Sequence, residues 1–301
     1  MNLCDINTVK RLMSKYATGT KKGFGQNFLI NEEVPYNIAN ESYSYHSMKN
    51  KASKKAVIEI GPGIGSLTSE LCRLYDKVVA VEIDKTLIPI LGETLGEFSN
   101  VEIINEDFLK LNLDEFLEKN LGECTISVCA NLPYYITTPI IMALLENARR
   151  ENGTSKFTSI MVMVQKEVAN RLCADSKSSD YGAITASINY YGEAKKLFDV
   201  SPDNFLPAPK VTSSVVRIEL YDEPKYKVKS EYMLSRVIAG AFAQRRKTLL
   251  NSLSSSFAEL SKEQIAKIIE GIGFDINIRG ERLSISDFCT VSDEFSKVLN
   301  K

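Results

Sequence analysis

Short apolar runs alternate with amphipathic stretches from residue 56 to about residue 220. The runs are rich in valine, isoleucine and alanine, as expected of strands buried inside a sheet. Between them, apolar residues recur at helical spacing, so that Leu67, Leu71 and Leu74 share one face. Strands joined by helices predict a parallel sheet with right-handed crossovers. The predicted strands are residues 56–60, 78–81, 101–104, 126–130, 158–164, 196–200 and 215–220.

Cap residues indicate where the intervening helices begin. Ser66 is a predicted N-cap for the first of them, and another helix is predicted over residues 85–97. Thr138 and Pro139 have the residue types of an N-cap and a first helical position. Residues 42–55, rich in Ser, Tyr and Lys, are predicted to form a long loop.

Only helical periodicity remains after residue 223. Ser261 and Gln264 have the spacing of a capping box. The predicted helices here are residues 232–253, 262–271 and 286–299. We therefore predict a Rossmann-like α/β domain over residues 1–222, with a basic N-terminal segment at residues 1–30, and a small all-helical domain over residues 223–301.

The composition is that of a water-soluble globular protein. Of the 301 residues, 44% are apolar and 25% are charged. No apolar run reaches the roughly 18 residues that a membrane-spanning helix needs, and residues 1–22 lack the apolar core of a signal peptide. We therefore expect a cytoplasmic protein without a membrane contact.

The cysteines and the histidine argue against a metal centre. The six cysteines form no CxxC pair, and the single histidine, His46, has no partner at metal-ligand spacing. An isolated histidine also disfavours a Ser–His or Cys–His nucleophile. We expect reduced, structural cysteines and no bound metal.

Basic residues gather in two places although the formal net charge is −1. Residues 223–301 carry 13 basic and 10 acidic side chains. Such clusters are usually solvated surface, and they gain meaning only if the rest of the chain requires a polyanion. The clusters are Lys10, Arg11, Lys15, Lys21 and Lys22 near the N-terminus, and Arg245, Arg246 and Lys247.

Distinctive residues follow the first three predicted strands, at the edge where such sheets bind ligands. A glycine-rich loop, residues 61–65, follows the first strand, Glu82 follows the second and Asp107 the third. A carboxylate at Glu82 can accept hydrogen bonds from both hydroxyls of a ribose, and one at Asp107 from an adenine amino group. Each acid alone would be an ordinary loop residue, but the two occur at successive strand ends.

The glycine spacing separates two classes of nucleotide. Gly61, Gly63 and Gly65 form GxGxG, and Ser66 occupies the third glycine position of the dinucleotide fingerprint GxGxxG. Pro62 removes a backbone donor that a pyrophosphate would use. We therefore predict S-adenosylmethionine, which has no phosphate, as the ligand.

The fourth strand ends in residues that suit methyl transfer to an adenine amine. The N6 lone pair is delocalised into the ring, so two acceptors that hold the N–H bonds would aim it at a methyl donor. The Asn131 side chain and the Leu132 carbonyl are candidate acceptors. Pro133 stiffens the turn, and Tyr134 offers a ring on which adenine can stack. In isolation these four residues would indicate only a strand-to-helix turn.

Phe205 has two interpretations that the sequence leaves equal. It lies in a proline-rich segment, residues 205–211, which could hold its ring over the pocket as a second stacking surface. An adenine would have to leave its duplex to reach such a surface. The alternative is that the ring simply packs against the sheet.

These motifs together resemble the ribosomal RNA adenine dimethyltransferases of the KsgA/RsmA type over residues 23–288. The matching segments are GQNFL at 25–29, EIGPGIGSLT at 59–68, VEID at 81–84, EDFL at 106–109, NLPYYITTPI at 131–140, FLPAPKVTSSVVR at 205–217, FAQRRKTL at 242–249 and RGERLSISDF at 279–288. The resemblance implies a class I S-adenosylmethionine-dependent methyltransferase fold. It also implies N6,N6-dimethylation of two adjacent adenosines near the 3′ end of 16S rRNA, in the small ribosomal subunit or its precursor.

The resemblance also assigns roles to particular residues. It implies that Asn27 and Leu29 contact the cofactor, with Gly61 and its loop neighbour Gly63 against the cofactor tail. Glu82 would hold the ribose, Asp107 the adenine, and Asn131 would lie between cofactor and target base. The candidate substrate-binding residues are Tyr134, Phe205, Arg245, Arg246 and Lys247. We expect a monomer.

Three other functions are compatible with parts of the sequence. An erythromycin-resistance-type enzyme, which methylates 23S rRNA, shares the glycine loop and the NLPY motif, but the C-terminal motifs favour the small-subunit type. A mainly non-catalytic assembly factor for small subunits stays open. An NAD-linked oxidoreductase is disfavoured by the glycine spacing and by the absence of a proton-relay histidine.

Overall fold

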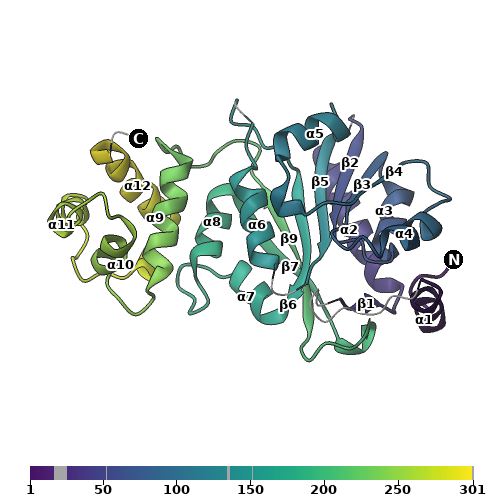
Figure 1. Cartoon of the computed structure of the whole chain (residues 1–301). Helices are drawn as coiled ribbons and strands as arrows, with labels where there is room; N and C mark the ends of the chain where they lie inside the picture. Colours follow the sequence, from purple (N-terminus) through teal and green to yellow (C-terminus); the bar gives the residue numbers. More distant parts are fainter. Residues whose placement is uncertain (17–25, 52, 134–135, 151, 300–301) are drawn as a thin grey trace. The chain divides into compact units, whose positions relative to one another are not determined.

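A computed structural model of the chain describes residues 1–16, 26–51, 53–133, 136–150 and 152–299 (Figure 1). Its contacts divide the chain into two compact units. The first consists of Met1–Arg150, Ser155–Ala169 and Lys195–Leu220, and the second of Glu151–Thr154, Asn170–Ala194 and Tyr221–Lys301. The predicted division after residue 222 lies close to the last of these breaks. It differs in one respect, because Asn170–Ala194 packs with the helical unit rather than with the sheet.

The first unit is built on a seven-stranded sheet. The strand order is β4-β3-β2-β5-β6-β9-β7, and all of the pairs from β4 to β6 are parallel, whereas β9 runs antiparallel to β6. This is the predicted Rossmann-like α/β arrangement, with one reversed strand near an edge. The strands are β2 (Lys55–Ile60), β3 (Lys77–Val81), β4 (Val101–Ile104), β5 (Thr125–Asn131), β6 (Ser159–Gln165), β7 (Gly192–Val200) and β9 (Ser213–Leu220).

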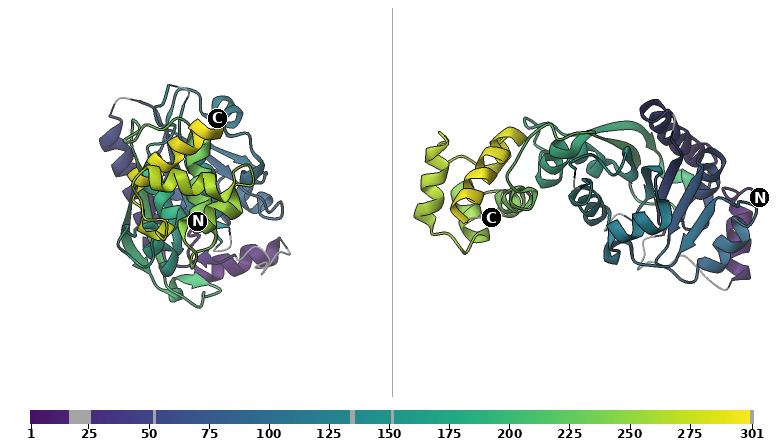
Figure 2. Two further views of the ribbon diagram at one scale, coloured as in Figure 1. Left: turned by 90° about the vertical axis from the view of Figure 1, so that its left-hand side faces the viewer. Right: turned by 90° about the horizontal axis from the view of Figure 1, so that it is seen from above.

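Helices cover both faces of this sheet (Figure 2). On one face α2 contacts β5 and β6, and α3 packs against α2 and β3. The helices of this unit are α1 (Ile6–Lys15), α2 (Glu33–Lys49), α3 (Ser66–Leu74), α4 (Ile88–Thr94), α5 (Leu113–Leu121), α6 (Thr137–Glu146) and the start of α7 (Lys166–Leu172), with 3-10 turns η2 (Phe108–Lys110) and η3 (Pro202–Asn204). A separate antiparallel pair joins β1 (Phe28–Leu29) to β8 (Phe205–Leu206).

The second unit is helical. Besides the end of α7, it contains α8 (Ala183–Tyr191), α9 (Glu231–Ala243), α10 (Leu249–Ser256), α11 (Lys262–Gly271), the 3-10 turn η4 (Gly280–Arg282) and α12 (Ile285–Leu299). The capping box of α11 is confirmed, since Gln264 N donates to Ser261 Oγ at 3.2 Å and Ser261 N donates to Gln264 Oε1 at 2.8 Å. The single helix predicted over residues 232–253 is wrong. It breaks into α9 and α10, with Thr248 capping the second through its bond to Asn251 N.

Two predicted helix starts also need correction. The N-cap of α3 is Gly65, at φ +91°, and Ser66 is the first helical residue, with its hydroxyl turned to Leu3 O at 3.4 Å. The start of α6 lies two residues earlier than expected, with Ile136 as N-cap, so Thr138 is inside the helix. There the first-turn hydroxyl that finds a backbone acceptor is that of Thr137, which donates to Pro133 O at 3.2 Å.

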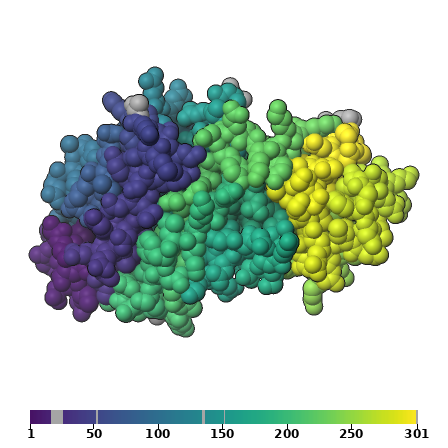
Figure 3. Space-filling model, turned by 180° about the vertical axis from the view of Figure 1, so that it is seen from behind, coloured from purple at the N-terminus to yellow at the C-terminus, as the bar shows by residue number. Residues whose placement is uncertain are grey.

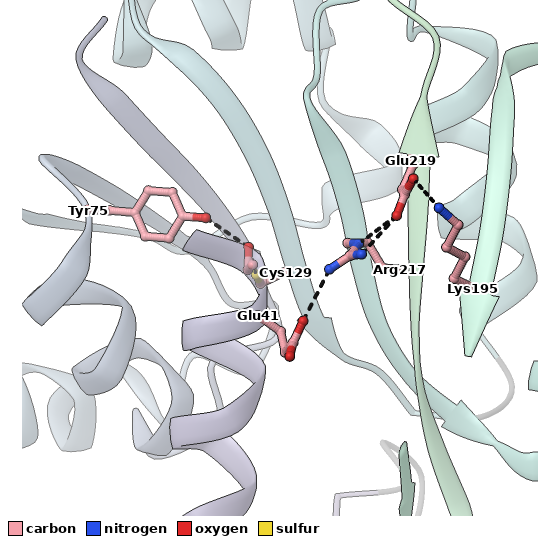
Figure 4. Close-up of polar contacts among 7 residues, drawn as sticks. Glu41, Tyr75, Cys129, Lys195, Arg217 and Glu219 are labelled. Carbon is pink, nitrogen blue, oxygen red and sulfur yellow. Dashed lines mark hydrogen bonds and ion pairs between the residues drawn. The ribbon is translucent and has the colours of Figure 1, made fainter. Parts of the chain in front are cut away.

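The predicted loop over residues 42–55 is instead mostly helical, because α2 continues to Lys49. Ser42 and His46 lie on the buried side of this helix, although their polarity suggests a loop. The Ser42 hydroxyl bonds to Tyr75 Oη at 2.8 Å and accepts from Cys129 Sγ at 3.2 Å (Figure 4). Polar groups of α2 inside the core thus find partners on β5 and at Tyr75, which caps the end of α3. The outer side of α2 forms part of the surface in the view of Figure 3, in indigo.

His46 is held neutral in this core. Its Nδ1 bonds to Ser127 Oγ and its Nε2 to Thr125 Oγ1, each at 2.8 Å. Burial lowers the pKa of His46 to about 4, helped by the charge of Lys55 and opposed by that of Asp76. Between pH 4 and about 6.5 the unfolded chain therefore binds a proton that the folded chain does not.

We predict that the free energy of unfolding falls as the pH is lowered from about 6.5 to 4, and that His46 contributes to this fall. Because the chain has one histidine, its imidazole signals in an NMR titration need no assignment. They should titrate near pH 4 in the folded protein and near 6.5 in denaturant. The substitution His46→Gln should flatten the stability profile in that window. An imidazole that titrates near 6.5 in the folded protein would contradict the prediction.

A half-buried ion network ties α2 to the last strands of the sheet. Figure 4 shows Arg217 between Glu41 and Glu219, with guanidinium–carboxylate distances of 3.2 and 2.8 Å. The guanidinium also lies 4.5 Å from the ring centroid of Tyr45. Burial raises the pKa of Glu219, but the bonds from Lys195 and Arg217 outweigh it and hold this pKa below its usual value.

We predict that Arg217→Met lowers the free energy of unfolding by about 1–3 kcal/mol. Breaking a buried ion pair typically costs about 3–5 kcal/mol, but here Glu219 keeps its bond to Lys195 Nζ at 2.7 Å. The matched control is Lys195→Met, which removes the more exposed partner and should cost about 0–1 kcal/mol. Urea denaturation of both variants measures the difference, and equal losses would count against the buried role of Arg217.

Among the described residues, none of the helices is long and apolar enough to cross a membrane. None of the six cysteines is in a disulfide bond in the described structure. The described part of the chain shows no group of three or more His, Cys, Asp or Glu side chains arranged to hold a metal ion.

Candidate functional site

A pocket opens in the first unit at the carboxyl ends of β2, β3 and β5. It gathers residues that are far apart in the chain and that the sequence singled out separately. Tyr134, the predicted stacking residue, lies outside the described residues, so its role stays a prediction. The predicted site residues that line the pocket are Asn27, Leu29, Gly61, Gly63, Glu82, Asp107, Asn131, Leu132, Pro133 and Phe205.

The glycine loop forms the floor of this pocket. Gly61 and Gly63 have φ angles of +73° and +62°, a conformation that L side chains rarely adopt. A Cβ atom on Gly63 would lie 3.5 Å from the Phe28 ring, which also lines the pocket. The loop is fixed by a hydrogen bond from Gly61 N to Val81 O at 2.9 Å. The glycines therefore let the main chain pass close to a bound molecule.

Glu82 follows β3 and is almost fully buried. Its Oε1 accepts from Asp84 N at 2.8 Å and its Oε2 from Gly63 N at 3.2 Å. Burial raises its pKa, and the backbone N–H groups of Asp84 and Gly63 oppose this rise. Each oxygen keeps further lone-pair capacity, so the fixed carboxylate can still accept two hydroxyl groups from a ribose.

Asp107 follows β4 and begins the turn η2. Its Oδ1 accepts from Leu109 N at 3.1 Å, and Lys110 Nζ lies 3.7 Å from Oδ2. Phe108, the next residue, is buried and lines the pocket. A carboxylate beside an apolar wall matches an adenine ring, whose amino group needs an acceptor and whose face needs a flat apolar contact.

Asn131 ends β5, opposite Met163 in the register with β6. Leu132 is buried, and Pro133 O accepts from Ile136 N at 3.1 Å and from the Thr137 hydroxyl. The turn that carries Asn131 is thus bonded to the first turn of α6. It presents the Asn131 side chain at the same pocket as Glu82 and Asp107.

The pairing of β1 with β8 brings Phe205 to the pocket. Leu29 pairs with Phe205, and Ile30 N donates to Asn204 O at 2.9 Å. The Phe205 ring is 3% exposed and packs with Leu29 in the core, yet it also lines the pocket. Packing is therefore established, and base stacking by Phe205 stays a prediction.

Some lining residues escaped the sequence analysis. Gln26 belongs to the GQNFL segment but had no role, and its Nε2 donates to Asp84 Oδ2 at 3.2 Å. Glu59 immediately precedes the glycine motif, and an acid in the apolar run AVIEI is a recognisable signal of a special role. The apolar wall of the pocket gives no distinct signal in the sequence, since hydrophobic residues at the ends of strands and helices have the same pattern as core residues. It comprises Phe28, Ile60, Ile64, Leu67, Val81, Leu87, Ile136 and Ile140.

None of the described residues of the two basic clusters lines the pocket. In the first unit, Lys10, Arg11 and Lys15 are exposed on α1, where Lys15 Nζ pairs with Glu93 at 2.7 Å; Lys21 and Lys22 lie outside the described residues. In the second unit, Arg245, Arg246 and Lys247 are exposed in the turn after α9. Arg245 bonds to the Ser179 and Tyr181 carbonyls and pairs with Glu281.

Comparison with known proteins identifies the family. The family described as "Ribosomal RNA adenine dimethylase" matches residues 17–297. The chain belongs to this family. Its members are methyltransferases, so the predicted enzyme class is confirmed.

Two curated relatives agree along nearly the whole chain. The protein named "Ribosomal RNA small subunit methyltransferase A" from Alkaliphilus oremlandii is 42% identical over 290 residues, which cover 96% of each chain. The protein of the same name from Lachnoclostridium phytofermentans is 43% identical over 293 residues, which cover 97% of each.

Solved structures share the fold. A dimethyladenosine transferase from Plasmodium falciparum has a TM-score of 0.68 at 22% identity, covering 89% of this chain and 97% of its own. The 23S rRNA methyltransferase ErmE has a TM-score of 0.60 at 21% identity, with coverage of 89% and 99%. At such identities these structures show the fold alone. They confirm the predicted Rossmann-like methyltransferase sheet with a helical C-terminal region.

Proposed function

We propose that the protein transfers methyl groups from S-adenosylmethionine to the N6 amines of two adjacent adenosines in 16S rRNA of the small ribosomal subunit. The observation that carries this proposal is the position of Asn131 and Leu132 in one pocket with Glu82 and Asp107. Residues suited to an amine and residues suited to an adenosyl group thus face one cavity. The small-subunit names of the curated relatives support the choice of substrate.

The hydrogen-bonding groups that line the pocket suit S-adenosylmethionine. Glu82 would hold the ribose hydroxyls, Asp107 the adenine amine, and the backbone at Gly61 the amino acid tail. When bound, S-adenosylmethionine supplies an electrophilic methyl group on a sulfonium. The described lining residues include no Lys, Arg or His. This matches a ligand that has a net positive charge and no phosphate group.

The chain's own residues would orient the target amine. The Asn131 side-chain oxygen and the Leu132 carbonyl would accept the two N–H bonds of adenine N6, drawing the nitrogen toward tetrahedral geometry. The lone pair then points at the methyl group, and the extra proton leaves after the transfer. No general base is needed, and the gain is mainly proximity and orientation. The described lining of the pocket comes from one chain, so a monomer would suffice for this reaction. We also propose that the protein works in the cytoplasm, where ribosomal subunits are its substrate.

The decisive assay uses radiolabelled S-adenosylmethionine and small subunits from cells that lack the modification. We expect about four methyl groups per particle, all in N6,N6-dimethyladenosine, because two adenosines each take two. Label in protein-free 23S rRNA but not in small subunits would replace the proposal with the erythromycin-resistance activity. Binding to small subunits without any label would indicate a non-catalytic assembly factor.

We also propose that Arg246 and Lys247 contact rRNA phosphates. Arg245 is tied to the protein by its carbonyl and carboxylate partners and would hold the turn, while Arg246 and Lys247 are exposed. Replacing both with alanine should weaken small-subunit binding and reduce the slope of log affinity against log salt by about 1–2. Cofactor affinity should not change. The matched control is Lys262→Ala with Lys267→Ala, two exposed lysines on α11, and equal slopes in both double variants would contradict the contact.

A further inference from the structure

Glu59 is a buried carboxyl that the proposed reaction does not use. It lies in β2, opposite Ala80 of β3 and Cys129 of β5, and its side chain is 1% exposed. Its Oε2 has no hydrogen-bond partner among the described residues, yet Glu59 lines the pocket. A buried acceptor without a protein partner either carries a proton or awaits a group from the ligand.

Among the described residues, the groups that act on Glu59 carry no positive charge. Thr68 and Cys72 face it from α3, Cys129 from β5 and Glu82 from the end of β3. Burial raises the pKa of Glu59 to about 8, and Glu82 adds to the rise, while Thr68 opposes it. Burial also raises the pKa of each of the two thiols to about 12, so both are neutral near pH 7.

The charge of the pocket points to a cationic ligand. Its acidic lining residues are Glu59, Glu82, Glu106 and Asp107, and the described lining has no basic side chain. S-adenosylmethionine carries a sulfonium, an ammonium and a carboxylate, a net charge of one positive unit. Its demethylated product has lost the sulfonium charge and is neutral overall.

We propose that Glu59 is protonated in the empty pocket and gives up its proton when the positively charged methyl donor binds. The O–H bond of the carboxylic acid breaks, the electron pair stays on the carboxylate, and the proton passes to solvent. The ionised Glu59 then stabilises the bound cation, and it stabilises the neutral product less. This inference rests on the proposed function. It makes Glu59 a specificity-determining residue that favours donor over spent product.

Isothermal titration calorimetry tests the inference on the full chain. The donor and its product, S-adenosylhomocysteine, are titrated at pH 6.5 in two buffers of different ionisation enthalpy, which gives the number of protons released. At this pH the amine of each ligand is protonated and contributes little. We expect close to one proton per donor and fewer per product. The dissociation constant for the donor should fall about tenfold from pH 6.5 to 7.5.

The matched variant is Glu59→Gln, which keeps the shape and cannot ionise. It should release almost no proton, bind the donor with an affinity independent of pH, and lose preference for donor over product. Donor binding without proton release by the natural protein, or equal release by the variant, would overturn the inference alone. Absence of donor binding would overturn the proposed function with it. If the variant fails to fold by circular dichroism, a flat pH profile of the natural protein is the overturning result.

Discussion

Replacing Asn131 with alanine should lower the rate constant for adenine methylation by about 10²- to 10³-fold. The side-chain oxygen of Asn131 is one of only two acceptors proposed to orient the target amine, and its loss leaves the N6 lone pair free to stay delocalised into the ring. Affinity for S-adenosylmethionine should change by less than about tenfold, because Glu82 and Asp107 line the same pocket and remain. Single-turnover kinetics with saturating cofactor and small subunits separate the two effects.

The control for Asn131 is the substitution to aspartate. It keeps an acceptor oxygen at the same position, so it should retain more activity than the alanine variant. Leu132 needs no matching variant, since its acceptor is a main-chain carbonyl. An alanine variant with an unchanged single-turnover rate would show that the proposed orientation of the amine is wrong.

Replacing Glu82 with alanine should weaken S-adenosylmethionine binding by about 10²- to 10⁴-fold. The proposed ribose contact has two hydrogen bonds to a charged acceptor, each contributing about 1.5–3 kcal/mol. The change also removes the acceptors of Gly63 N and Asp84 N, so the glycine loop should loosen and the free energy of unfolding should fall. Equilibrium titration with the cofactor measures the first effect and urea denaturation the second.

The variant Glu82→Gln separates charge from geometry. Its amide oxygen can still accept one of the two backbone N–H groups, so we expect a smaller loss of stability than in the alanine variant and an intermediate loss of affinity. Binding to small subunits should survive in both variants, because the basic turn after α9 belongs to the other unit. Loss of that binding in a folded variant would show that cofactor and ribosome binding are not separable.

The calorimetric and kinetic experiments inform each other. If Glu59 responds to the charge of the donor, as inferred above, the affinity measured for any pocket variant depends on pH. Comparisons of Glu82 and Asn131 variants are therefore best made at one pH near 8.5, above the pKa of Glu59, which is about 8. At that pH most of the carboxyl is ionised before binding, so proton release contributes less to the measured affinity.

Much of the fold follows from local patterns. The strands at β2 to β5 coincide with apolar runs that are bounded by polar or glycine residues, and α11 begins at a capping box that is visible in the sequence. These features depend on residues within about ten positions, so the sequence alone determines them. The parallel edge then places Gly61, Glu82, Asp107 and Asn131 together, because the carboxyl ends of parallel strands meet at one edge.

Other features depended on contacts between distant segments, and only the tertiary structure decided them. The helix α2 extends through the segment expected to be a loop because Ser42 finds a partner at the C-cap of α3, Tyr75, and His46 finds one on β5. Phe205 is buried because β8 pairs with β1, which lies about 175 residues earlier in the chain. The unpartnered oxygen of Glu59 is likewise a property of the packed interior. No local pattern encodes such pairings, because each depends on which distant segment packs against the residue. The same packing determines how deeply a polar side chain is buried and whether it is protonated.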